Sequence, residues 1–289
     1  MFEARLTDVA TQVAAHLDDI LADYPDQRVV QAMRYAVAGG KRLRAFLVIE
    51  GAALHDVPVA RALNAAAAVE ALHAYSLVHD DLPCMDDDDL RRGLPTVHVK
   101  WDQATAVLAG DALQTLCFGL LADPATHPDG AVRADLVASM ALAAGARGMV
   151  YGQALDIAAE TADQPLTLDQ ITELQAGKTG ALIRWSAEAG ARLAGADVAP
   201  LGAYADALGL AFQIADDILD VEGDAEKAGK RLQKDAEAGK ATFVSLLGLD
   251  GAKARARQLV DQACTSLDPY GTSAENLRQA ARFVISREM

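Results

Sequence analysis

The chain carries one dense acidic segment, Asp80-Asp81-Leu82-Pro83-Cys84-Met85-Asp86-Asp87-Asp88-Asp89, and Arg91 and Arg92 follow it. Six carboxylates within ten residues repel one another unless a cation or solvent screens them. Mg²⁺ binds carboxylate oxygens and keeps positions for water and substrate phosphates, and arginine binds phosphate oxygens through paired hydrogen bonds. The segment therefore indicates a site for metal and phosphate together, with a solvated acidic turn as the alternative.

A second acidic cluster follows an apolar helical stretch near the C-terminus. Asp216 and Asp220 are four residues apart, so they share one face of a helix, with Asp217 beside them. Two such clusters, each at the end of a long apolar helix and each followed by cations, predict a cavity in which opposed carboxylates hold several Mg²⁺ ions and a diphosphate. Such ions lower the barrier to breaking a carbon–oxygen bond. Apolar walls below the carboxylates would suit a hydrocarbon tail.

Two groups of cations stand near glycines. Lys41, Arg42 and Arg44 directly follow Gly39-Gly40, which is typical of an anion site, although a solvated helix start is the alternative. Gly177-Lys178-Thr179-Gly180 interrupts a helix that begins at the capping box Thr167–Gln170. Glycines weaken a helix interior, so a kink there would direct Lys178 and Thr179 into a cavity, with a plain helix junction as the alternative.

Apolar residues recur at helical spacing along most of the chain, which predicts an all-α protein. The Asp80 helix should end within a turn at Pro83, with Asp80 and Asp81 on its last turn and Asp86 in a loop that curls back. Residues 222–240 lack an apolar period and predict a mobile loop. No linker or repeat divides the chain, so we expect a single domain over residues 1–289. The expected helices cover residues 2–20, 29–37, 45–54, 59–79, 104–121, 136–158, a segment from 168 onward, 203–221, 246–264 and 273–286.

Composition excludes several classes of protein. A formal charge of -15 and a pI near 4.7 argue against nucleic acid or an anionic membrane surface as partner. No targeting peptide is recognisable, and no uncharged apolar run reaches the ~18 residues of a membrane span, so we expect no stable membrane insertion. Cysteines are few, odd in number and widely spaced, which is typical of reduced thiols in a cytoplasmic protein: Cys84, Cys117 and Cys264.

Taken together, these motifs resemble those of the short-chain trans-polyprenyl diphosphate synthases, especially the bacterial farnesyl diphosphate synthases. The resemblance covers nearly the whole chain, and its motifs occur in the family's order. They are Gly40-Lys41-Arg42-Leu43-Arg44, the aspartate-rich motif Asp80–Asp86 with Arg91-Arg92-Gly93, Gly152-Gln153, Lys178-Thr179-Gly180, and Phe212-Gln213 before the second aspartate motif Asp216–Asp220.

The resemblance implies an all-α bundle around a deep central cavity, assembled as a homodimer, and it implies residue roles. Three Mg²⁺ ions are expected, two on Asp80, Asp81 and Asp86 and one on Asp216, Asp217 and Asp220. The allylic diphosphate would be held by Arg91, Lys178, Lys230 and Lys240. Isopentenyl diphosphate would be held by Lys41, Arg44, His73 and Arg92. Thr179 and Gln213 would stabilise the allylic cation, and the departing diphosphate would take the proton.

Product length is a separate expectation. The growing chain should descend along the helix that carries Asp80, so a bulky residue one to two turns below it would stop growth. Tyr75 and Ser76 occupy those positions, and the family's bacterial farnesyl enzymes pair an aromatic residue at Tyr75 with a two-residue insertion like Pro83-Cys84. A straight helix does not direct Tyr75 under Asp80, so this expectation follows from the resemblance.

The chain departs from the family's pattern at Ala45, Tyr151, Gln233 and Phe243, none of which removes a metal ligand or a diphosphate-binding cation. A geranylgeranyl diphosphate synthase is the competing enzyme. A non-catalytic partner subunit would be expected to have lost acids from one motif, and both are intact. A di-iron bundle needs two Glu-x-x-His pairs, and only Glu70 and His73 form one.

Overall fold

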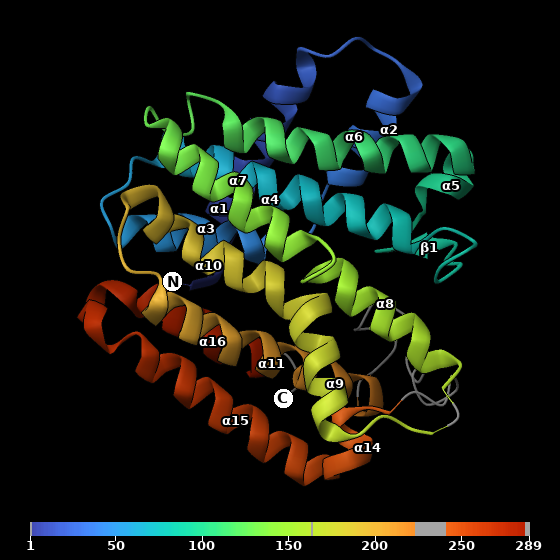
Figure 1. Ribbon diagram of the computed structural model, residues 1–289, viewed down its shortest axis with the longest axis vertical. Coiled ribbons are helices and arrows are strands. Elements are labelled where there is room, and N and C mark those ends of the chain that lie inside the picture. The colour runs from blue at the N-terminus through green and yellow to red at the C-terminus, as the bar shows by residue number, and fades with distance from the viewer. Residues whose placement is uncertain (1, 163, 223–240, 287–289) are drawn as a thin grey trace. The chain divides into compact units, whose positions relative to one another are not determined.

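The computed structural model describes residues 2–162, 164–222 and 241–286 (Figure 1). These residues form helices and the turns between them, apart from an antiparallel hairpin of β1 (Leu90–Arg91) and β2 (Leu94–Pro95). The predicted all-α class is therefore confirmed. The chain falls into two compact units, Met1–Val137 with Arg192–Ala196 and Ala138–Ala191 with Asp197–Met289, and the single domain stays a prediction.

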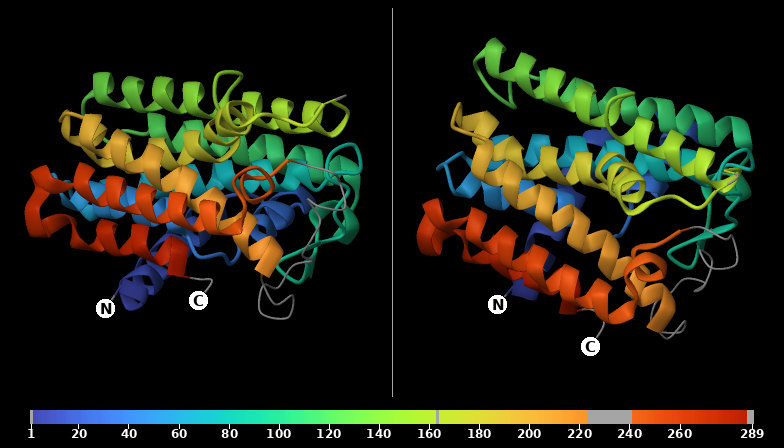
Figure 2. Two further views of the ribbon diagram at one scale, coloured as in Figure 1. Left: turned by 90° about the horizontal axis from the view of Figure 1, so that it is seen from below. Right: turned by 60° about the horizontal axis from the view of Figure 1, so that its bottom comes forward.

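In the first unit α4 is the helix on which the others pack. It contacts α1, α2, α3 and α6, and it lies alongside α6 in both views (Figures 1 and 2). Its middle is a run of fully buried alanines, residues 65–68, whose small side chains allow neighbouring helices to approach closely. The helices of this unit are α1 (Phe2–Ala22), α2 (Arg28–Val37), α3 (Leu43–Ala53), α4 (Val59–Asp80), α5 (Val97–Lys100) and α6 (Gln103–Ala122).

In the second unit α11 (Ala199–Glu222) packs against α15 (Leu249–Ser266) and α16 (Glu275–Ser286). Figures 1 and 2 show α15 and α16 side by side. The buried Tyr204 hydroxyl donates to Leu277 O at 2.8 Å, which ties α11 to α16. This unit also contains α8 (Met149–Glu160), α9 (Leu168–Gln175), the π-helical turn η1 (Ala176–Gly180), α14 (Phe243–Leu247) and the 3-10 helix η2 (Asp268–Ala274).

Two helices that the sequence predicts as continuous are broken. The expected helix 136–158 is α7 (Gly130–Ala144) followed by α8, because the chain turns at Gly145–Gly148, where a side chain on Gly148 would overlap Ala143 O. The expected helix 246–264 is α14 followed by α15, because Gly248 has φ +69°, a left-handed conformation that favours glycine. Apolar periodicity continues across both breaks, so the sequence pattern missed them.

Near Lys178, where the sequence leaves a kink and a plain helix junction as alternatives, the structure has a π-helical turn. The capping box at Thr167 and Gln170 starts α9 as predicted. The five residues that include Gly177, Lys178 and Gly180 then form η1, and α10 (Ala181–Ala194) continues the helix. A π-helical turn inside a helix often marks a functional site.

One described helix, α6, is long and apolar enough to cross a membrane on length and composition alone. Half of its most apolar window is buried, and it packs against α2, α4 and α5. Core helices of globular proteins have the same length and composition. The packing of α6 accounts for the buried half of this window.

Candidate active site

The first aspartate motif begins where α4 ends. The helix closes at Asp80, Asp81 is its C-cap, and Asp86 N donates to Asp80 O at 2.8 Å. This bond returns the loop to the end of the helix, which confirms the predicted curl. Asp81 is buried, Asp80 is partly exposed and Asp86 is exposed.

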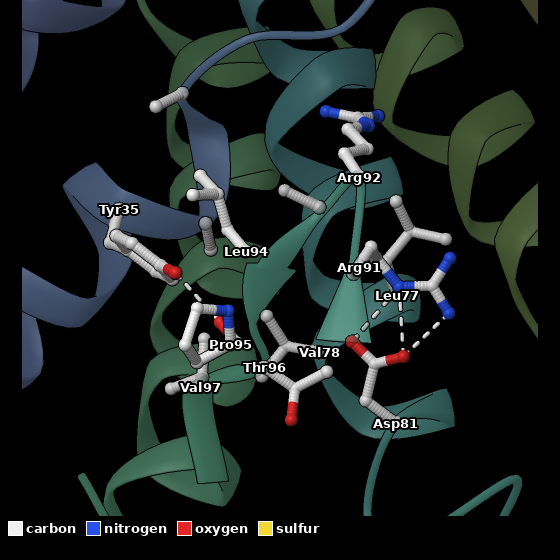
Figure 3. A pocket seen from close by; sticks show the side chains of 13 residues that line it. Tyr35, Leu77, Val78, Asp81, Arg91, Arg92, Leu94, Pro95, Thr96 and Val97 are labelled. Atoms are coloured by element: carbon white, nitrogen blue, oxygen red, sulfur yellow. Dashed lines mark hydrogen bonds and ion pairs between the residues drawn. The ribbon is translucent and has the colours of Figure 1, made fainter. Parts of the chain in front are cut away.

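The hairpin after this loop presents Arg91 to Asp81 (Figure 3). Arg91 Nε donates to Asp81 Oδ1 at 2.8 Å and to Oδ2 at 2.9 Å, and Arg91 Nη2 donates to Oδ1 at 2.5 Å. Burial raises the pKa of Asp81, and the guanidinium opposes this rise. The hairpin also covers a pocket with mostly apolar walls, into which Leu77, Val78 and Leu94 contribute side chains.

Cations gather a few turns back along α4, beside the loop that precedes α3. The guanidinium of Arg92 lies against Gly40, where a Cβ would be 2.7 Å from Arg92 Nη1. Burial and the charge of Arg92 lower the pKa of Arg44. Arg44 Nε is buried without a hydrogen-bond partner. A buried unpaired donor beside other cations is an anion-binding arrangement, because an anion would satisfy the donor and offset the repulsion.

His73 faces this group and is neutral near pH 7. Burial and the charges of Arg44, Arg92, Arg91 and Arg42 lower its pKa well below the usual value. A neutral imidazole still donates one hydrogen bond and accepts another, so His73 suits a polar ligand without adding charge. The structure thus brings His73, Arg44 and Arg92 together, with the exposed Lys41 on the adjoining loop.

The low pKa of His73 makes stability depend on pH. Below pH 6.5 a histidine in the unfolded chain binds a proton that His73 in the folded protein does not, so the unfolded state gains protons and stability falls as pH falls. Between pH 6.5 and 5.5 we expect the free energy of unfolding of His73→Gln to fall less steeply than that of wild type, by up to ~1.4 kcal/mol per pH unit. Urea denaturation at each pH measures this. His55, also of lowered pKa, contributes equally to both proteins, so parallel curves would contradict the prediction.

In the second unit, η1 carries Lys178 and Thr179. Lys178 Nζ forms an ion pair with Asp156 Oδ2 of α8 at 2.6 Å. Gly152 of α8 allows this approach, because a Cβ there would overlap the backbone nitrogen of Lys178. Thr179 Oγ1 lies 3.5 Å from Gln213 Oε1 on α11. The structure therefore brings Lys178, Thr179 and Gln213 into one group.

The second aspartate motif divides its carboxylates between two environments. Asp217 is buried, with Oδ1 accepting from Gln213 Nε2 at 3.0 Å and Oδ2 accepting from Phe243 N at 2.8 Å. Asp216 and Asp220 are partly exposed and lie one turn apart on α11. Asp217 therefore orients Gln213 and the start of α14, whereas Asp216 and Asp220 are more accessible to an ion.

The donor set fits Mg²⁺ in a particular way. Among residues 2–162, 164–222 and 241–286, no three acidic, histidine or cysteine side chains converge as a ready metal cage. Mg²⁺ seldom needs one, because it is commonly bound by one or two carboxylates with water and substrate phosphates as the other ligands. Asp80 with Asp86, and Asp216 with Asp220, supply such pairs of hard oxygen donors.

The remaining predicted site residues fall in three places. Tyr75 is half-buried and packs edge-to-face on His79, with ring centroids 5.0 Å apart. Ser76 Oγ donates to His73 O on its own helix at 2.9 Å. Lys230 and Lys240, together with Gln233, lie outside the described residues.

Sequence reasoning assigned no role to Asp156 or Glu70, and both pair with cations in the segments that carry predicted site residues. Asp156 pairs with Lys178, and Glu70 forms an ion pair with Arg42 at 3.0 Å. The available signal was the same for both: a single acid within an apolar helical stretch. Burying a lone carboxylate is costly, so such a residue indicates a cationic partner elsewhere in the fold.

Comparison with known proteins is consistent with this geometry. A family model described as polyprenyl synthetase matches residues 26–280. The chain belongs to the polyprenyl synthetase family. Among the relatives of this polyprenyl synthetase is the farnesyl diphosphate synthase of Escherichia coli, which is 47% identical over 300 aligned residues that cover 99% of each chain.

Solved structures of other polyprenyl synthetases share the fold. An FPP/GFPP synthase from Zymomonas mobilis in its apo form superposes with a TM-score of 0.90 and 46% identity, covering 98% of each chain. A geranyltransferase from Helicobacter pylori, complexed with magnesium and isoprenyl diphosphate, gives a TM-score of 0.80 and 33% identity over 98% of this chain and 97% of that one. The family expected from the sequence motifs is confirmed.

Proposed function

We propose that this polyprenyl synthetase is a prenyltransferase that condenses isopentenyl diphosphate with dimethylallyl or geranyl diphosphate to form farnesyl diphosphate. The observation that carries the proposal is the layout of α4. Its C-terminal end supplies the carboxylates Asp80 and Asp81, and His73, about 10 Å earlier along the helix, belongs to a cation group. One helix thus offers two different ways of binding a diphosphate, as a two-substrate condensation requires. The relationship to the Escherichia coli farnesyl diphosphate synthase supports the same reaction.

The aspartate motifs are assigned to three Mg²⁺ ions and the allylic diphosphate. Asp80, Asp81 and Asp86 would hold two ions, and Asp216 with Asp217 and Asp220 the third. When bound, the ions neutralise charge that develops on the diphosphate as its bond to carbon breaks. The H. pylori relative, complexed with magnesium and isoprenyl diphosphate, supports the choice of metal.

Arg91 and Lys178, with Lys230 and Lys240, are assigned to the same diphosphate. In this structure Arg91 is paired with Asp81 and Lys178 with Asp156. When the diphosphate binds, its oxygens replace these carboxylates as partners of Arg91 and Lys178, or share the two cations with them. The carboxylates therefore hold both cations in position before the substrate binds. Such preorganised charge stabilises a leaving group without the cost of reorganisation during the reaction.

The second substrate, isopentenyl diphosphate, is assigned to Lys41, Arg44, His73 and Arg92. This group binds the diphosphate without a metal ion. The double bond of isopentenyl diphosphate then attacks the allylic carbon. Thr179 and Gln213 direct oxygen atoms at the cation that forms, and the departing diphosphate takes the proton that is lost. Each of these residues binds or orients a substrate. The carbon–oxygen bond breaks because positive charges surround the leaving diphosphate.

The proposal is tested by incubating the enzyme with labelled isopentenyl diphosphate and, separately, dimethylallyl, geranyl and farnesyl diphosphate. We expect Mg²⁺-dependent farnesyl product from the first two starters and little extension of the third. Dominant twenty-carbon product would instead identify a geranylgeranyl diphosphate synthase. No incorporation from any starter would overturn the proposal.

Tyr75 is assigned to limiting product length. Its ring packs edge-to-face against His79 one turn further along the same helix, so it is a bulky obstacle on α4. We expect Tyr75→Ala to shift the main product beyond fifteen carbons, as read by chromatography of the dephosphorylated products. The matched control Tyr75→Phe keeps the ring and should keep the farnesyl product. An unchanged product from Tyr75→Ala would show that other residues limit the length of the product.

Assembly as a homodimer and a cytoplasmic location complete the proposal. The homodimer is carried over from the family resemblance, and sedimentation equilibrium would show a mass near twice that of the 30.4 kDa chain. A monomeric mass would contradict it. Cys84, Cys117 and Cys264 are free thiols, as in proteins of a reducing compartment.

A further inference from the structure

Glu70 is a buried acid among cations, and the roles above leave it unused. It lies one turn before His73 on α4 and is 5% exposed. A carboxylate this deeply buried is retained in a fold only where it is paired and hydrogen-bonded. Its partners therefore indicate what it does.

Both oxygens of Glu70 bind the segment that carries the predicted isopentenyl diphosphate cations. Glu70 Oε2 accepts from Arg42 Nη1 at 3.0 Å, and Oε1 accepts from Ala45 N at 3.0 Å. Arg42 also donates to Val37 O at the end of α2. One carboxylate thus fixes the loop at both ends, at the end of α2 through Arg42 and at the first turn of α3 through Ala45.

The loop needs such restraint because its backbone is unusual. Arg42 has φ +54°, in the left-handed region that costs energy for a residue with a side chain. Arg42 is 7% exposed and directed inward, although its neighbours in sequence, Lys41 and Arg44, are predicted ligands. The ion pair with Glu70 therefore gives Arg42 a structural role, whereas Lys41 and Arg44 remain the predicted ligands.

Glu70 also acts on the cation group by charge. Its carboxylate favours the protonated, charged forms of Arg44 and Arg92, against the burial that lowers the pKa of both. Without a nearby negative charge, the neighbouring guanidiniums of Arg44 and Arg92 would repel one another and move apart. The Glu70 carboxylate thus opposes that separation.

We propose that Glu70 is a positioning residue for the homoallylic substrate: by holding Arg42 and the start of α3, it presents Lys41 and Arg44 to a diphosphate that carries no metal. The inference rests on the proposed function, because it assumes that this cation group binds isopentenyl diphosphate. It predicts a defect confined to one substrate. The allylic diphosphate, held by the aspartate motifs, should be bound as before.

The test compares Glu70→Gln with Glu50→Gln. Glu50 is a matched control, since it is 6% exposed and pairs with Arg5 at 2.8 Å, but on α3 it faces α1 rather than the loop. We expect Glu70→Gln to raise KM for isopentenyl diphosphate at least about tenfold, with kcat and KM for geranyl diphosphate changed less than threefold. Glu50→Gln should lower the melting temperature without changing either KM.

A second readout does not depend on turnover. Titration calorimetry with inorganic diphosphate in EDTA measures the metal-free anion site directly, and we expect at least about tenfold weaker binding in Glu70→Gln only. Failure of the wild-type enzyme to incorporate isopentenyl diphosphate would overturn the proposed function but leave this titration decisive for Glu70. Equal affinity in wild type, Glu70→Gln and Glu50→Gln would overturn the role of Glu70.

Glu70→Asp is the alternative variant for this test if Glu70→Gln does not fold. The shorter side chain keeps the charge but cannot reach both Arg42 and Ala45 in the same way. Positioning predicts weakened diphosphate binding despite the retained charge. Wild-type affinity in Glu70→Asp would contradict positioning, because charge alone would then be sufficient.

Discussion

Replacing Asp80 or Asp216 by asparagine lowers kcat with geranyl and isopentenyl diphosphate by about 10²–10³-fold, the range found when one preorganised charge-stabilising group is removed. The amide keeps the size of the side chain and removes the charge that a metal ion requires. Both variants should keep the wild-type melting temperature, because both side chains are partly exposed. Initial rates at several Mg²⁺ concentrations measure the effect.

Asp87→Asn is the matched control for these variants. Asp87 lies in the same acidic loop, is exposed, and has φ +51°, a conformation that asparagine also adopts readily. It is not among the assigned ligands, so its rate should stay within about threefold of wild type. Equal losses in Asp87→Asn and Asp80→Asn would show that overall loop charge, not a defined ligand, drives the reaction.

Gly152→Ala should destabilise the protein by about 3 kcal/mol, the upper end for an overpacked site. A Cβ at this position would overlap the backbone of Lys178, so α8 and η1 would have to separate. Lys178 would then move away from Asp156, and kcat should fall as well. Urea denaturation gives the stability, and initial rates give the activity.

Gly119→Ala provides the control for helix propensity. Gly119 is an exposed helical residue of α6, and a Cβ there meets nothing within 4 Å. Alanine is the better helix former, so this variant should be ~0.5–1 kcal/mol more stable than wild type. Gly152→Ala as stable as Gly119→Ala would mean that α8 and η1 are not in backbone contact.

Much of the fold was predictable because helices leave a periodic signal. The bounds of α4 and α6 differ from the predicted ones by a residue or so at each end, and the capping box located the start of α9. The breaks at Gly145–Gly148 and Gly248 were missed, since their flanking helices have similar apolar patterns. Two strands of two residues each are too short to show an alternating pattern.

The site was predictable where charge alone reveals it. The crowded carboxylates at Asp80–Asp89 need screening by a cation or by solvent wherever they are placed, so the motif is recognisable from the sequence alone. The pairing of Lys178 with Asp156 and of Arg42 with Glu70 joins residues 22 and 28 positions apart. Such pairs depend on how helices pack, which local spacing does not specify. The sequence therefore located the clustered charges better than the single acids that pair with Lys178 and Arg42.

The most direct test of the account is binding of a geranyl diphosphate analogue in which a methylene group replaces the oxygen between carbon and phosphorus. This analogue binds without reacting, so calorimetry isolates the metal-bridged diphosphate from later steps. We predict tight binding with Mg²⁺, at least about tenfold weaker binding in EDTA, and the same weakening in Asp80→Asn and Asp216→Asn with Mg²⁺ present. Binding of equal strength with and without Mg²⁺ in the wild-type enzyme would contradict the account.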